Sequence, residues 1–148
     1  MSWGTSLWIA RGLAVVGFLD AAYLTASYFA GSALACGPGG GCELVTTSPY
    51  ATLGPVPIAA IGLGYYALVS LIVWTPAGGL SRGLLGSLFL LTGTAVAVST
   101  VLFYLQAVVI GAWCRFCLVS AGVTVLLFLT ALVLARAARP AGEAPTGP

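Results

Sequence analysis

Four cysteines, arranged as two pairs, are the residues of this sequence best suited to chemistry. Cys36 and Cys42 are separated by Gly-Pro-Gly-Gly-Gly, and Cys114 and Cys117 enclose the dipeptide Arg-Phe. A cysteine pair accepts or releases two electrons as it cycles between two thiols and a disulfide, and one pair passes them to another by thiol–disulfide exchange. Two pairs in one chain therefore predict an electron relay.

The second pair has a physical reason to be reactive. Cys114 and Cys117 lie at the start of an apolar run, residues 113–134, which is expected to be a helix. The free N–H groups and the dipole at a helix N-terminus favour negative charge, and Arg115 adds a cation, so a thiol here is expected to ionise readily. The spacing of three residues puts both sulfurs on one face of the helix.

The first pair has a different character. The glycine-rich spacer between Cys36 and Cys42 predicts a flexible segment with long reach and low steric protection. Such a pair is suited to accept electrons from an outside protein and to deliver them to the fixed pair.

Three other interpretations of the cysteines stay open. Either pair can be a plain structural disulfide, the four thiols can bind zinc or another soft metal, or they can be inert and buried. The five-residue spacer is wide for a metal site, and the chain has no histidine. We therefore predict no metal site.

The elements that must position the cysteines are membrane helices. Of the 148 residues, 60% are hydrophobic and only 5% are charged, against about 25% charged in soluble domains. The net charge of +2 gives no reason to expect nucleic acid as a partner. Runs of about 20 apolar residues cross a bilayer as helices, because backbone groups in lipid must bond internally. Four such runs occur, at residues 7–30, 56–74, 84–110 and 113–134.

The expected fold is an all-α integral membrane protein, a bundle of four transmembrane helices. A long external loop, residues 31–55, connects the first two helices, and Leu44, Val45 and Tyr50 predict a short interfacial helix in it. We divide the chain into a membrane domain, residues 1–135, and a disordered cytoplasmic tail, residues 136–148, which is rich in proline, glycine and alanine.

Arginine placement predicts the orientation. Positively charged residues concentrate on the cytoplasmic side of membrane proteins. With four spans, only Arg115 falls on one side, whereas the other side holds Arg11, Arg82, Arg136 and Arg139. Both termini are therefore expected in the cytoplasm and all four cysteines outside. An oxidising exterior fits the plasma membrane of a bacterium, where disulfides persist on the periplasmic side.

Taken together, these residues resemble the vitamin K epoxide reductase family, in its bacterial branch that supports disulfide formation. The resemblance covers nearly the whole hydrophobic part of the chain. Besides the four cysteines and Ser48, which lies six residues after Cys42, it is carried by Gly17, Asp20, Tyr23, Leu24, Gly54, Pro57, Gly62 and Tyr66.

The resemblance implies a quinone inside the bundle, ubiquinone or menaquinone, with the loop above it as a lid. It implies that Cys117 meets the quinone, that Cys114 exchanges with Cys42, and that Cys36 lies closer to a partner protein. It also implies a serine or threonine near the quinone, here Ser48. Many bacterial members carry a fused thioredoxin-like domain after the last helix, whereas only about a dozen residues follow here. The expected partner is therefore a separate thioredoxin-fold protein.

The sequence departs from the animal members of the family at two positions. Those members have an asparagine near the start of the second helix and a tyrosine after the active cysteines, where this chain has Ile58 and Ala121. The resemblance implies that Ile58 and Ala121 still contact the quinone. The hydrogen bonds that hold the quinone oxygens must therefore come from elsewhere, with Ser48 and backbone groups as candidates. Two aromatic side chains next to the active cysteines, Trp113 and Phe116, are further candidates for contact with the ring.

The expected activity is thus that of a membrane thiol:quinone oxidoreductase. A quinone or quinone-epoxide reductase running on external thiols uses the same chemistry. Members of an unrelated four-helix disulfide oxidase family also have two external pairs, but their active pair comes in the first external loop. From other classes, a soft-metal carrier and a structural tetraspan protein remain alternatives. Asp20, an acid inside the first span, has either a proton-relay role or a packing role.

Overall fold

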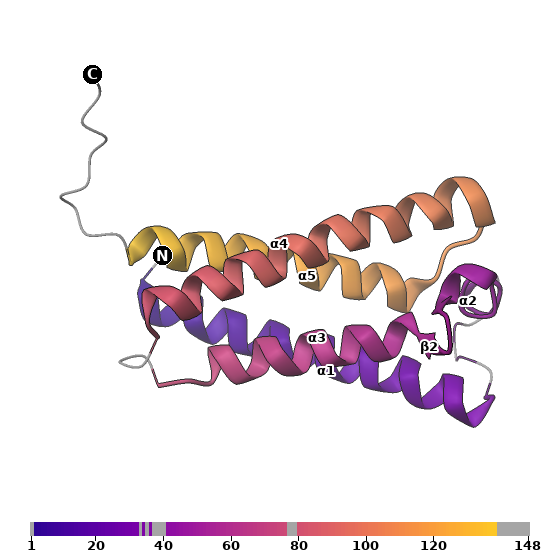
Figure 1. Ribbon diagram of the computed structural model, residues 1–148, viewed down its shortest axis with the longest axis horizontal. Helices are drawn as coiled ribbons and strands as arrows, with labels where there is room; N and C mark the ends of the chain where they lie inside the picture. The colour runs from indigo at the N-terminus through magenta and orange to yellow at the C-terminus, as the bar shows by residue number, and fades with distance from the viewer. Residues whose placement is uncertain (1, 33, 35, 37–40, 77–79, 139–148) are drawn as a thin grey trace, which may run out of the picture.

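The computed structural model of the chain describes residues 2–32, 34, 36, 41–76 and 80–138. Four helices longer than fifteen residues dominate this part and lie side by side along one axis (Figure 1). They are α1 (Trp3–Ala30), α3 (Ile58–Val73), α4 (Arg82–Tyr104) and α5 (Arg115–Ala137). A π-helical segment, η3 (Leu105–Ile110), prolongs α4 without a break.

Three of these helices are long and apolar enough to cross a membrane. They are α1 with 28 residues, α4 together with η3 with 29, and α5 with 23. The second predicted span is shorter than expected, because α3 has only 16 residues and a length of about 24 Å. Pro57 precedes its first residue, and residues 52–57 form a hairpin instead of helix: β1 (Thr52–Leu53) pairs with β2 (Val56–Pro57).

The predicted domain boundary at residue 135 falls inside α5, which continues to Ala137. Of the predicted tail, residues 136–148, the part from residue 139 onward lies outside the described residues. The division into domains stays a prediction.

Helix α1 packs against α3 and α5, and α4 packs against α5. Small residues allow the close approach of α1 to α3: a side chain on Gly17 would overlap the ring of Tyr66. Tyr66 is almost fully buried, and its hydroxyl group lies 2.8 Å from the carbonyl oxygen of Ser120 and 3.0 Å from the Thr124 hydroxyl oxygen. Hydrogen bonds of this kind hold helices together within a lipid bilayer, where the hydrophobic effect does not drive helices to associate.

One end of the bundle carries the first turn of α1, the last turn of α5 and the start of α4 (Figure 1). Here Arg11 donates a hydrogen bond of 2.9 Å to the carbonyl oxygen of Val73, at the end of α3. The guanidinium group lies 5.1 Å from the ring centre of Trp8 and 5.3 Å from that of Trp74. A cation at a helix C-terminus satisfies free carbonyl groups, so Arg11 ties the short α3 to α1.

The opposite end carries the cysteines. The chain leaves α1 at Gly31, which has a left-handed conformation with φ 60°, and then forms α2 (Cys42–Thr46) and the short 3-10 helix η1 (Pro49–Ala51). The link from η3 to α5 reaches the same end (Figure 1). The first long connection thus contains a short helix, in which Val45 is buried and Leu44 is exposed.

Candidate active site

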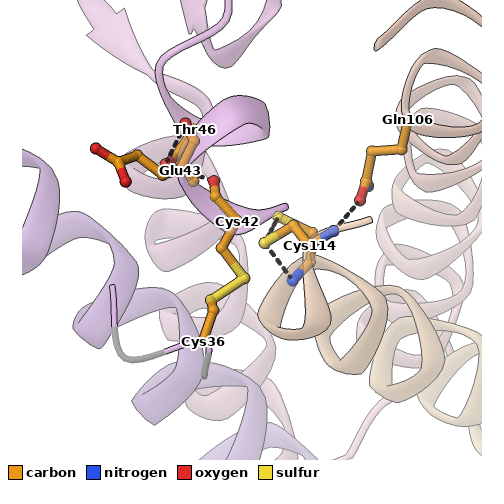
Figure 2. Close-up of a disulfide and its surroundings, with 7 residues drawn as sticks. Cys36, Cys42, Glu43, Thr46, Gln106 and Cys114 are labelled. Carbon is orange, nitrogen blue, oxygen red and sulfur yellow. Dashed lines mark hydrogen bonds between the residues drawn. A yellow bond between two sulfur atoms is a disulfide. The ribbon is translucent and has the colours of Figure 1, made fainter. Parts of the chain in front are cut away.

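Cys36 and Cys42 form a disulfide, whereas Cys114 and Cys117 are free thiols. Figure 2 shows the disulfide beside Cys114, at the start of α5. Cys36, Cys42 and Cys114 belong to one buried hydrophobic cluster, and Cys117 packs against it. The structure therefore brings together the two pairs that lie more than 70 residues apart in the sequence.

The first pair is better protected than its glycine-rich spacer suggests. Only 7% of Cys36 and none of Cys42 is exposed. The prediction of low steric protection is therefore wrong for this conformation. The physical reason is a close backbone contact: Gly41 lies against Ala112 and Trp113, and a Cβ atom on Gly41 would come within 2.7 Å of the Ala112 Cβ atom. Residues 37–40 lie outside the described residues.

Cys114 is the N-cap of α5. Its sulfur accepts hydrogen bonds from the backbone N–H of Cys117, at 3.3 Å, and from the thiol of Cys117, at 2.8 Å. A sulfur that accepts hydrogen bonds is more stable as a thiolate. The Cys117 thiol in particular lowers the pKa of Cys114 to about 7, although burial acts in the opposite direction. Of the two thiols of the second pair, Cys114 is therefore the one whose contacts favour the thiolate.

Gln106, on η3, is a site residue that the sequence analysis missed. Its side-chain oxygen accepts a hydrogen bond of 2.9 Å from the backbone N–H of Cys114 (Figure 2). Only 4% of Gln106 is exposed. A single glutamine in an apolar run gives little signal in a sequence, but a polar residue inside a membrane helix is expensive and for that reason worth noting. π-Helical segments, too, occur frequently at functional sites.

A cavity of about 350 Å³ lies below the cysteines, a size suited to a small organic molecule. Residues of α1, α3, α4, η3 and α5 form its walls, and residues 45–51 cover part of it. Cys117 lines the cavity, whereas Cys114 does not. The second pair therefore bridges two environments, with Cys114 in the disulfide cluster and Cys117 at the cavity.

The predicted quinone-contacting residues divide into two groups. Ser48, Ile58 and Ala121 line the cavity. The Ser48 hydroxyl donates a hydrogen bond of 2.7 Å to the carbonyl oxygen of Val45. Phe116 and Trp113 are not among the lining residues: Phe116 packs on Tyr23, and Trp113 packs on Phe103, at ring-centre distances of 5.1 and 5.2 Å. All five assignments stay predictions.

Asp20 on α1 is half-buried and is also absent from the cavity lining. One of its carboxyl oxygens is buried without a hydrogen-bond partner. Among the described residues, no three histidine, cysteine, aspartate or glutamate side chains gather as metal ligands do.

The fold and the site together define a class: a helical membrane protein with two adjoining cysteine pairs and a cavity that one cysteine lines. Comparison with family models gives a match to the vitamin K epoxide reductase family over residues 8–132. The chain belongs to this family, and it is accordingly an oxidoreductase of the membrane. Comparison with individually curated proteins gives no match.

Proposed function

We propose that this protein is a thiol:quinone oxidoreductase of the bacterial plasma membrane that supports disulfide formation. Electrons enter from a separate thioredoxin-fold protein at Cys36 and Cys42, pass to Cys114 and Cys117, and leave on ubiquinone or menaquinone. The observation that carries the proposal is the placement of Cys114 and Cys117, one beside the disulfide and the other on the cavity wall.

The first step is exchange with the partner. A thiolate of the partner attacks Cys36, the Cys36–Cys42 disulfide breaks, and a mixed disulfide forms. The second partner thiol then releases the partner as a disulfide, which leaves Cys36 and Cys42 as two thiols. Two electrons and two protons have entered the chain.

The second step moves the electrons inward. When Cys114 and Cys117 form a disulfide, the thiolate of Cys42 attacks Cys114, and Cys36 resolves the mixed disulfide so that Cys36–Cys42 forms again. Cys114 and Cys117 are then two thiols, as in the structure. The common cluster of the sulfurs supports this transfer, because exchange requires one sulfur to reach another.

The last step oxidises Cys114 and Cys117 to a disulfide and reduces the quinone to the quinol. Cys117 supplies the contact with the quinone from the cavity wall. The two thiols lose two electrons and two protons in total, and the quinone gains both. The apolar cavity fits an apolar ring, and Ser48, Ile58 and Ala121 are candidate contacts.

The proposal includes four membrane crossings, with α3 as the shortest. Arg11, which binds the end of α3, and the tryptophans beside it give that end an interfacial character. With Arg11, Arg82 and Arg136 at this end, both termini lie in the cytoplasm and the cysteines face the periplasm. Aromatic and charged anchors let a short helix span by local thinning of the bilayer.

The disulfide speaks against a soft-metal carrier, because it occupies two of the four sulfurs that such a site needs. The deciding experiment is quinone reduction by the purified protein in detergent, followed by ultraviolet absorbance. With dithiothreitol as donor, we expect turnover in the wild type and none in Cys117→Ala. Cys36→Ala should lose turnover selectively when a reduced thioredoxin-fold protein replaces dithiothreitol.

If the wild type reduces neither ubiquinone nor menaquinone, and metal binds stoichiometrically to the reduced cysteines, the oxidoreductase proposal is wrong for this chain.

A further inference from the structure

Two polar groups on the cavity wall have no hydrogen-bond partner among the described residues, and both can donate a hydrogen bond. The first is the hydroxyl of Tyr65 on α3, which is buried and makes no hydrogen bond. The Thr124 hydroxyl lies near Tyr65 on the same wall, but its hydrogen bond is to Tyr66, at 3.0 Å. A hydroxyl that is removed from water without a partner destabilises the protein, so a buried hydroxyl of this kind points to a missing acceptor.

The second donor is the side-chain amide of Gln106. Its oxygen is assigned by its partner, because only an oxygen can accept the hydrogen bond from the Cys114 N–H. The NH₂ group must therefore point the other way. Within the described residues this nitrogen has no hydrogen-bond partner, and Gln106 lines the cavity.

We propose that Gln106 and Tyr65 donate hydrogen bonds to the two carbonyl oxygens of the quinone. The inference rests on the proposed function. A quinone ring has acceptors but no donors, so it complements two wall groups that can each donate a hydrogen bond and have no acceptor among the described residues.

This assignment also gives a reason for rate enhancement. Negative charge grows on the quinone oxygens as electrons arrive, and donors already aimed at them stabilise that charge without reorganisation. Gln106 contributes a second effect, because the same amide holds the backbone of Cys114. One planar group therefore fixes the ring relative to the cysteine pair that reduces it.

Tyr65→Phe is the first test, because it removes a single oxygen. We expect the KM for quinone to rise roughly three- to tenfold, with the rate of Cys36–Cys42 reduction by dithiothreitol unchanged. Tyr66→Phe is the matched control: its hydroxyl is satisfied within the protein, so it should lower the melting temperature and leave the quinone KM unchanged. If the KM responds to Tyr66→Phe and not to Tyr65→Phe, the assignment of Tyr65 is wrong.

Gln106→Met tests the second donor by binding alone, without any thiol. Ubiquinone should raise the melting temperature of the wild type, since a ligand stabilises the state that binds it. We expect this rise to be largely lost in Gln106→Met and reduced in Tyr65→Phe. A merely structural role, as an anchor for Cys114, predicts slower thiol exchange but an intact rise, and that result would overturn the donor role.

The wild type separates the two levels of inference. If the wild type reduces quinone, and neither Tyr65→Phe nor Gln106→Met weakens quinone binding, only the assignment of the two donors is wrong. A wild type that neither binds nor reduces quinone contradicts the proposed function, and the donor assignment with it.

Discussion

At the scale of single residues, Cys114 combines three roles that are usually divided among several groups. It caps α5, accepts two hydrogen bonds from Cys117 and is held by Gln106. These contacts make one sulfur of the pair the better anion. The asymmetry makes Cys114 the thiol that ionises more readily, whereas Cys117 is the thiol that lines the cavity.

The first prediction concerns the ionisation of Cys114. Because its pKa is lowered to about 7, the thiolate should be present above pH 7 and disappear as the pH falls below it. Ultraviolet absorbance of the thiolate during a pH titration measures this. Cys117→Ala removes the thiol donor and should move the midpoint upward, toward the ordinary cysteine value. A midpoint that stays unchanged in Cys117→Ala would show that the thiol–thiol hydrogen bond is not the cause, and Cys114→Ala should abolish the signal.

At the scale of elements, the first connection is held against the start of α5 by backbone contact. Gly41, just before α2, contacts the segment that connects η3 to α5. A Cβ atom added to Gly41 would lie 2.7 Å from the Ala112 Cβ atom and 3.1 Å from the Trp113 nitrogen. The contact places Cys42 next to Cys114. Only glycine fits between two backbones at this separation.

The second prediction follows from this contact. In a Cys36→Ala, Cys117→Ala background, only Cys42 and Cys114 remain, and we expect them to form a disulfide readily under mild oxidation. Adding Gly41→Ala should lower the yield several-fold, because the new methyl group separates the segments. Thiol counting with a maleimide measures the yield. Gly122→Ala, at a position with no neighbouring atoms within 4 Å, is the control, and an equal loss there would refute the explanation.

The sequence predicts the elements well where one strong pattern determines them. Apolar runs locate α1, α4 and α5, and the two cysteine pairs identify the chemistry. The sequence does not predict features that depend on contacts between segments far apart in the chain. Cys36 and Cys42 are buried because Gly41 packs closely against Ala112. The role of Gln106 depends on a π-helical segment, and an apolar run in a sequence does not distinguish a π-helix from an α-helix. The shortness of α3 follows from the hairpin before it.

At the scale of the whole molecule, the two ends of the bundle differ. One end holds Arg11, Arg82 and Arg136, together with the tryptophans that flank Arg11. The other end holds the cysteines, with Arg115 as its arginine among the described residues. This polarity is the basis for the proposed orientation in the membrane.

The third prediction tests that orientation. In a cysteine-free variant, a new cysteine at the exposed Leu44 of α2 should react with a membrane-impermeant maleimide in intact bacterial cells. A cysteine at Ser81, before α4, should react only after the cells are permeabilised. The reverse pattern would place the cysteine end in the cytoplasm and contradict the proposed direction of electron flow.

The burial of Cys36 has a consequence for which donors are accepted. A small thiol gains almost no binding energy from the protein. It therefore reaches the disulfide only when the connection between α1 and α3, which carries Cys36 and Cys42, moves away from the start of α5 by itself. A protein that docks on that segment can use its binding energy to hold the open form. The buried disulfide thus favours donors that bind the protein, so a small thiol such as dithiothreitol should reduce it more slowly than a docking protein does.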